Sequence, residues 1–437
     1  MKWAHWLVLG WLWSTTAVAE VVLGSDKNTA DLDIGCLYPL TGPSALWGSD
    51  AVVAIKMALD KLKTDPNAPT MRVTVADTMG KQYRSREIAL QFIEREQVDV
   101  LCGVVNSNIA LETSKLAFES RTLFLGAGHS SPRLTEDALH PWYFHLNNDA
   151  SQSSGAGARY LQDIKDEWRW KTLSYIGPDY EYGHQIWQKM LTALDSLDVD
   201  YHVKDEFYSL HGEKDYRRYI DALLADPPDI VVSGHWTRDL VSFIEQAQLA
   251  GLFSRTRFVN FDTGGGYFVL SRLGDALPEG LVLSARSHVN WPATEANREY
   301  VGEFYRRAGR YPTFIAQDAY AVITALATAW KQAPEKTVEG VRLSLGGLSF
   351  SLPEDPEGFQ SVIDPRTHRI LQVQAIGETV ADGRYSPATR TLGKWKFYSP
   401  YELPNVIESV AETSVAGSSS DERSKWRLGA ESAHVGR

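Results

Sequence analysis

Short apolar runs alternate with segments of helical periodicity along the first third of the chain. The runs at 33–38, 71–76, 98–104 and 122–125 have the length and composition of buried strands. Between them, apolar residues recur at spacings of three and four, as on one face of a helix, and the first such set is Ala51, Ile55, Ala58, Leu59 and Leu62. Alternating strands and helices predict parallel β-α-β units.

The same pattern restarts near residue 172, so the chain contains a second α/β half of similar build. The pattern predicts strands at 172–177, 201–208, 229–234, 257–261 and 281–285, and helices at 182–197, 215–225, 239–250, 296–308 and 316–331. From residue 341 the pattern changes, and the segments 341–364 and 370–387 are predicted to be strands joined by Pro/Gly turns. The sequence therefore predicts an α/β protein with two doubly wound lobes and a cleft between them.

Ligands of open parallel sheets bind beyond the carboxyl ends of the strands. We therefore searched the residues that follow each predicted strand for chemistry suited to a small molecule. The candidates are Trp47, Ser107, His129, Ser130, Tyr182, Trp236 and Asp262.

The polar candidates suit a zwitterion. Ser107, together with backbone N–H groups near His129 and Ser130, suits a carboxylate, and Asp262, helped by the Tyr182 hydroxyl, suits an ammonium. Each also has an ordinary alternative, because Ser107 can cap the helix that it begins and Asp262 can cap a turn. If His129 lines the cleft, its protonation predicts a change in ligand affinity between about pH 5.5 and 8.

Two aromatic candidates would form apolar walls. Trp47 ends the segment PLTGPSALWG, residues 39–48, whose two prolines stiffen a loop at the mouth of a helix. Trp236 follows the predicted strand at 229–234. The alternative is that Trp47 covers the core of the first lobe and that Trp236 is a packing aromatic.

Composition excludes some classes of function. The chain has 437 residues, 43% of them hydrophobic, and a net charge of −11, so it is long enough for two or more domains and carries no basic footprint for nucleic acid. The motifs G-x-S-x-G, H-E-x-x-H and the P-loop do not occur, and GAGHSS at 126–131 matches only the start of a dinucleotide fingerprint. We therefore expect no enzyme, no cofactor and no metal site.

The first 19 residues have the form of a signal peptide. A lysine precedes an apolar run of about 11 residues, and Ala17 and Ala19 allow cleavage before Glu20. No cysteine follows that site, so we expect a soluble exported protein without a lipid anchor. In such a compartment Cys36 and Cys102, both in predicted strands, either pair as a disulfide or remain two buried thiols.

The order and spacing of several motifs resemble the periplasmic solute-binding proteins of the leucine/isoleucine/valine-binding family, which serve ABC importers. The similarity runs from about residue 33 to about residue 395 and rests on PLTGPSALWG, GVVNSN, GAGHSSPRLT, PDYEYG, GEKDY and Asp262. It implies two flavodoxin-like lobes joined by three hinge crossovers. It also implies that Ser107, Ser130, Tyr182 and Asp262 hold the charged ends of an amino acid.

The resemblance also implies a domain plan and partners. The plan is a signal peptide at 1–19, a first lobe at 31–148 and 285–346, a second lobe at 149–284 and 347–400, and a disordered tail at 401–437. The implied partners are a small solute, captured in the periplasm by a monomer through clamshell closure, and an ABC permease with its ATPase.

The sequence does not decide the chemical identity of the ligand. His129 stands where the family has a small residue, Trp236 stands where the branched-chain binders tend to carry tyrosine, and the segments IDPRTHRI and IGETVADGRYSP resemble the amide- and urea-binding branch. The alternatives are an amide, urea or aromatic-acid binder of the same fold, or a sensor that docks on a receptor instead of a permease.

Overall fold

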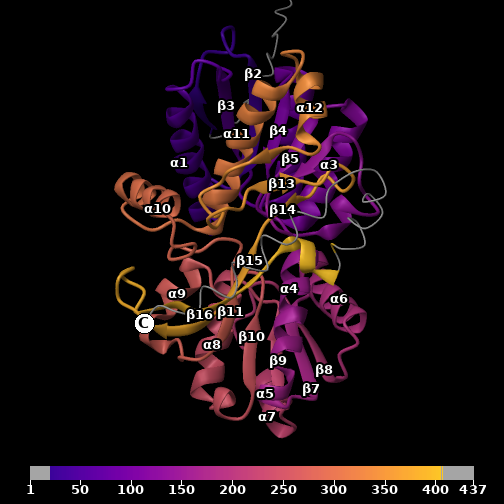
Figure 1. Ribbon diagram of the computed structural model, residues 1–437, viewed down its shortest axis with the longest axis vertical. Coiled ribbons are helices and arrows are strands. Elements are labelled where there is room, and N and C mark those ends of the chain that lie inside the picture. Colours follow the sequence, from indigo (N-terminus) through magenta and orange to yellow (C-terminus); the bar gives the residue numbers. More distant parts are fainter. Residues whose placement is uncertain (1–19, 405, 407–437) are drawn as a thin grey trace, which may run out of the picture.

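Two large and mostly parallel sheets form the frame of the computed structural model, which describes residues 20–404 and residue 406. Figure 1 shows the first sheet in the upper lobe and the second in the lower lobe. The predicted α/β fold with two doubly wound lobes is confirmed.

The sheet of the first lobe has the order β1-β3-β2-β4-β5-β6. Its parallel strands are β2 (Leu32–Tyr38), β3 (Met71–Asp77), β4 (Val100–Gly103), β5 (Leu123–Gly126) and β6 (Tyr143–His145). The helical elements between them are α1 (Ala45–Leu62), α2 (Gln82–Leu90), η1 (Gln91–Glu96), α3 (Ser107–Ser120) and η2 (Pro132–Thr135). The edge strand β1 (Glu20–Gly24), which periodicity did not predict, runs antiparallel to β3.

The sheet of the second lobe has the order β16-β15-β11-β10-β9-β7-β8. Its strands are β7 (Thr172–Pro178), β8 (His202–Ser209), β9 (Ile230–Ser233), β10 (Arg257–Asn260), β11 (Val282–Ser284), β15 (Gln374–Ala381) and β16 (Arg390–Tyr398). Its helical elements are α4 (Ala150–Asp163), α5 (Lys165–Trp168), α6 (Glu181–Ser196), α7 (Arg217–Ala225), α8 (Thr237–Leu249), η3 (Leu252–Ser254), α9 (Tyr267–Leu273) and η4 (Gly274–Ala276). The strands β15 and β16 complete it in antiparallel fashion.

The chain returns to the first lobe after β11 and leaves it again before β15. Figure 1 shows the orange helix α11 beside α1 in the upper lobe. The elements of this return are α10 (Glu295–Ala308), α11 (Phe314–Gln332), α12 (Val338–Leu345), β12 (Ser349–Phe350), β13 (Ser361–Ile363) and β14 (Ile370–Leu371), and η5 (Pro400–Glu402) follows β16. A bridge joins His145 to Arg369, so the first lobe's return reaches past the boundary predicted at residue 346.

Helices α4 and α12 are among the elements in which the structure differs from the prediction. Strand was predicted over 341–364, but α12 covers its start, residues 341–345, while β12 and β13 lie in the rest. The hydroxyl of Thr337 caps α12 by accepting the N–H of Gly340. Helix α4 was missed because its sequence, ASQSSGAGARYLQD, is mostly small and polar and shows no apolar stripe. It forms because Asp149 caps it and because nearly all of its residues are buried.

Cys36 and Cys102 form a disulfide, which decides between the two alternatives left open by the sequence. They occupy paired positions of the neighbouring parallel strands β2 and β4, with their Cα atoms 4.4 Å apart. This separation lies at the short end of the range that a disulfide spans.

The two ends of the chain were predicted from composition alone. The predicted signal peptide at 1–19 lies outside the described residues, and β1 begins directly after the expected cleavage site. The predicted tail begins too early at residue 401, because Leu403 and Val406 are fully buried in the core of the second lobe. The rest of that predicted tail, 407–437, lies outside the described residues. Within the described part of the chain, we find no helix with the length and apolarity needed to cross a bilayer.

Candidate functional site

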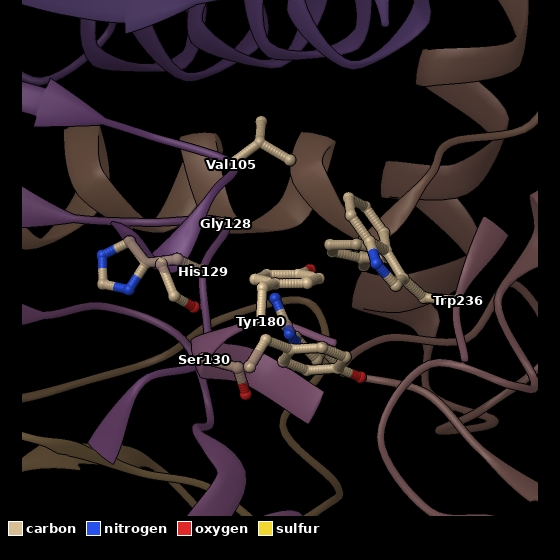
Figure 2. Close-up of a pocket in the computed structure, with 10 residues that line it drawn as sticks. Val105, Gly128, His129, Ser130, Tyr180 and Trp236 are labelled. Carbon is tan, nitrogen blue, oxygen red and sulfur yellow. The ribbon is translucent and has the colours of Figure 1, made fainter. Parts of the chain in front are cut away.

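A small pocket of about 220 Å³ lies between the lobes, at the carboxyl ends of their strands (Figure 2). The first lobe lines it from the loops after β4 and β5 and from the start of α11, and the second lobe lines it from the loops after β7, β9 and β11. The lining residues are Val105, Ser107, Gly128, His129, Ser130, Tyr180, Tyr182, Trp236, Arg286 and Phe314. Figure 2 shows His129 and Ser130 on the opposite side of the pocket from Trp236.

Five of the seven residues predicted from the sequence line this pocket: Ser107, His129, Ser130, Tyr182 and Trp236. Trp47 and Asp262 do not line it, and each lies one layer behind a residue that does. The pocket also contains Arg286, which the sequence analysis missed. Arg286 directly follows the predicted strand at 281–285, so the same search of strand ends could have found it.

The first lobe contributes hydroxyls that helix capping does not use. Ser107 is the first residue of α3, but the N-cap is Asn106, whose Oδ1 accepts the N–H groups of Asn108 at 2.9 Å and Ile109 at 3.3 Å. The alternative interpretation of Ser107, as the cap of this helix, is therefore wrong. The Oγ atom of Ser130 is buried and has no hydrogen-bond partner in the described part of the chain. Such a group is costly to bury unless a ligand completes it.

His129 is a neutral wall of the pocket. Its ring packs edge-on against His145 at 4.6 Å between centroids, and its Nε2 lies 3.3 Å from the Tyr143 hydroxyl. Burial lowers the pKa of His129 well below 6.5, and the neighbouring His145 ring and the charge of Arg286 lower it further. The ring therefore stays neutral between pH 5.5 and 8, which contradicts the expected pH response. Its Nδ1 atom has no partner among the described residues.

The second lobe contributes a charged pair that is already assembled. The guanidinium of Arg286 donates from Nη2 to Asp262 Oδ2 at 2.9 Å, and its Nε lies 3.4 Å from Oδ1. The hydroxyls of Tyr182 and Ser153 each donate to this carboxylate at 2.9 Å. Burial opposes the charge of Arg286, but Asp262 raises the pKa of the guanidinium by more, so Arg286 is held as a cation.

The charge that faces the pocket is therefore positive. The carboxylate of Asp262 is enclosed by three donors, whereas Nη1 of Arg286 is buried without a partner in the described residues. These contacts do not support the assignment of Asp262 to a ligand ammonium. They give it another task, which is to hold the guanidinium of Arg286 against the pocket.

Aromatic rings enclose the remaining sides. The guanidinium of Arg286 lies 4.9 Å above the ring of Phe314, and the rings of Tyr182 and Trp236 meet edge to face at 6.4 Å. Trp47 packs behind this wall, with ring centroids 5.4 Å from Phe268 and 5.9 Å from Phe314. It is 6% exposed and borders a second cavity of about 230 Å³, which shares Phe314 with the first.

No group of histidine, cysteine, aspartate and glutamate side chains in the described residues could hold a metal ion. The pocket thus offers one cation, neutral hydroxyls and an imidazole, and several flat apolar surfaces. These groups are chemically suited to an organic anion.

The family model described as periplasmic binding protein matches residues 31–384. The chain belongs to this family, and the resemblance predicted from the sequence is confirmed. The Leu/Ile/Val-binding protein homolog 1 of Brucella suis biovar 1 (strain 1330) is 24% identical over 360 residues, which cover 79% of this chain and 93% of that protein.

Solved structures share the fold. A solute-binding protein of an ABC transporter from Rhodopseudomonas palustris BisB5, in complex with 3,4-dihydroxybenzoic acid, matches with a TM-score of 0.74 and 18% identity, over 84% of this chain and 97% of that one. A leucine-binding protein from Thermotoga maritima MSB8 matches with a TM-score of 0.70 and 15% identity, over 85% of this chain and all of that one. The same architecture therefore holds either an aromatic acid or an amino acid.

Proposed function

We propose that this protein is the solute-binding component of an ABC importer and that it captures an aromatic monocarboxylate in the periplasm. The observation that carries the proposal is the unpartnered Nη1 of Arg286 in the pocket wall. A buried guanidinium with an unused donor is an unfavourable state, and a ligand carboxylate would relieve it through a charge-assisted hydrogen bond.

The other donors of the pocket support the same ligand. Ser130 carries an unpartnered buried hydroxyl, and Ser107 begins α3, where the positive end of the helix dipole favours an anion. Tyr182, Trp236 and Phe314 offer the flat surfaces against which an aromatic ring packs well. The complex of the Rhodopseudomonas palustris protein with 3,4-dihydroxybenzoic acid is an example of this ligand class on the same fold.

A branched-chain amino acid is the second candidate, because the matched curated relative is named a Leu/Ile/Val-binding homolog. An amino acid brings an ammonium as well as a carboxylate. The pocket lining contains no aspartate or glutamate, and the nearest carboxylate, Asp262, already pairs with Arg286. The ammonium would lose its hydration without gaining a counter-charge, which disfavours this ligand.

Binding would close the two lobes on the ligand. Ser130 belongs to the first lobe and Arg286 to the second, so a ligand that contacts both stabilises the closed form over the open one. Two contacts between the lobes already flank the pocket, since Ser131 donates to Glu181 at 2.8 Å and Lys189 pairs with Glu136 at 2.7 Å. The closed monomer would deliver its solute to a permease and its ATPase without chemical change. A receptor in place of the permease is the alternative partner.

A thermal-shift screen tests the proposal. The panel contains benzoate, hydroxybenzoates, aliphatic carboxylates, L-leucine, L-valine, urea and short amides, and calorimetry then measures each hit. We expect aromatic carboxylates to stabilise the protein, by about 2.7 kcal/mol at a hundredfold excess over the dissociation constant. Stabilisation by leucine or by an amide, with none by the aromatic acids, would overturn the assignment.

A further inference from the structure

A second acidic side chain, Asp318, lies one helical turn from the pocket residue Phe314. Asp318 belongs to α11 and is 4% exposed, and its Oδ2 has no hydrogen-bond partner in the described part of the chain. It follows Phe314 by four residues, so both side chains lie on one face of the helix. Phe314 packs under the guanidinium of Arg286, which places Asp318 one turn along the face that this cation covers.

Five ionisable groups on separate elements interact with Asp318. They are Arg286 after β11, Asp262 after β10, Tyr38 in β2, Tyr300 in α10 and Glu354 after β12. Burial raises the pKa of Asp318 to about 8, with Arg286 lowering it and Asp262 raising it further. Burial also raises the pKa values of Tyr38, Tyr300 and Glu354, so burial favours the neutral form of each of these three groups.

The state of Asp318 decides how many negative charges share one guanidinium. When Asp318 holds its proton, Arg286 and Asp262 balance each other, and a ligand carboxylate adds one negative charge. When Asp318 is ionised, two aspartates already compete for Arg286 before the ligand arrives. Like charges in a buried site repel strongly, so the second arrangement binds an anion less well.

We propose that Asp318 ties the affinity of the pocket for a carboxylate to its own protonation, because an ionised Asp318 competes with the ligand for Arg286. This inference rests on the proposed function, because it requires the ligand to be an anion held by Arg286. Asp318 acts through Arg286 and is a positioning residue, not a ligand contact.

The coupling has a definite sign. Below pH 7, Asp318 is protonated with or without the ligand, so affinity is constant. Above pH 8, binding must return a proton to the carboxyl, and affinity falls toward tenfold per pH unit. At pH 9 the wild type should bind about tenfold more weakly than at pH 7.

Calorimetry with benzoate between pH 6.5 and 9.5 tests this coupling in wild type, Asp318→Asn and Glu354→Gln. Asparagine keeps the shape of Asp318 and cannot ionise, so this variant should bind with nearly constant affinity. Glu354→Gln removes a neighbouring buried carboxyl that does not interact directly with Arg286, and it should keep the fall in affinity above pH 8. In the wild type, titrations at pH 8.5 in buffers of different ionisation enthalpy should report an uptake approaching one proton.

Each outcome decides one of the two proposals. No benzoate binding to any of the three proteins would overturn the carboxylate site, and this inference with it. Binding with the same pH profile in wild type and Asp318→Asn would overturn the role of Asp318 alone.

A ligand-free measurement checks the same titration. A carboxyl whose folded pKa is raised loses stability as pH rises from its unfolded pKa to its folded pKa. The stability of Asp318→Asn relative to wild type should therefore increase between about pH 5 and 8. A difference that stays constant over this range would show that Asp318 does not titrate as required.

Discussion

The two halves of the pocket differ in how far their polar groups are satisfied without a ligand. On the second lobe, Arg286, Tyr182 and Ser153 complete a hydrogen-bonded set around Asp262, and the buried atoms of the lining left without a hydrogen-bond partner in the described residues are Nη1 of Arg286 and Nε1 of Trp236. On the first lobe, buried polar atoms of Ser130 and His129 have no partner within the described chain. Under the proposed function, the second lobe would hold the ligand anion through the preassembled Arg286, and the first lobe would gain its missing partners from the ligand.

The largest effect on ligand affinity should come from replacing Arg286. Arg286→Met deletes the charge and leaves Asp262 buried without its partner, which costs about 3–5 kcal/mol of stability. Carboxylate affinity should fall by a hundredfold or more, measured by calorimetry on protein shown to be folded by circular dichroism. Arg286→Lys is the matched control, since lysine keeps the positive charge but lacks the planar guanidinium with its several N–H donors. This variant should retain part of the affinity.

Replacing Asp262, which pairs with Arg286, should lower stability without lowering ligand affinity. Asp262→Asn keeps the hydrogen bonds from Tyr182 and Ser153 within reach but leaves Arg286 without a counter-ion, so urea denaturation should show a loss of stability of about 3–5 kcal/mol. Carboxylate affinity should be retained or increased, because the guanidinium is less neutralised. Loss of binding with full stability would return Asp262 to the role of a direct ligand contact.

Substitution of Trp47 should mainly lower stability, whereas substitution of Trp236 should mainly lower ligand affinity. Trp47 is buried against Phe268 and Phe314 and does not line the pocket, so Trp47→Ala should cost about 3–5 kcal/mol of stability with little change in the affinity of the folded protein. Trp236 lines the pocket and is only partly buried, so Trp236→Ala should weaken binding with a smaller loss of stability. The reverse pattern would make Trp47 the ligand-facing wall.

The smallest effect concerns His129. Because burial keeps its pKa well below 6.5, affinity should be constant between pH 5.5 and 7 in wild type, and the profile should keep its shape in His129→Gln. Calorimetry at three pH values in this range checks it. A steep change near pH 6.5 that the variant removes would show that His129 titrates.

Hydrophobic patterning predicted the frame of the fold because buried strands need continuous apolar runs and amphipathic helices need a stripe. Hydrophobic patterning missed elements that lack a continuous apolar run or an apolar stripe. Helix α4 is buried through small side chains such as Gly157, which lies against Phe261, and β1 is a short edge strand whose residues alternate in exposure.

The site could be predicted in position but not in charge. Strand ends gave the correct loops, because parallel strands bring their carboxyl ends to one edge. The sequence did not reveal that Asp262 pairs with Arg286, since the pairing depends on how the loops after β10 and β11 fold against each other. The sign of the charge that faces the pocket, on which the proposed ligand class rests, follows from that one contact.

The proposed function depends most on the binding of a negative charge by Arg286. Calorimetry with benzoate and benzamide tests it directly, because the two molecules share ring and shape and differ in charge. We predict that benzoate binds to the wild type and that benzamide binds at least a hundredfold more weakly, the loss expected for an unpaired buried cation. Equal affinity for the two molecules, or tighter binding of L-leucine than of benzoate, would contradict the account.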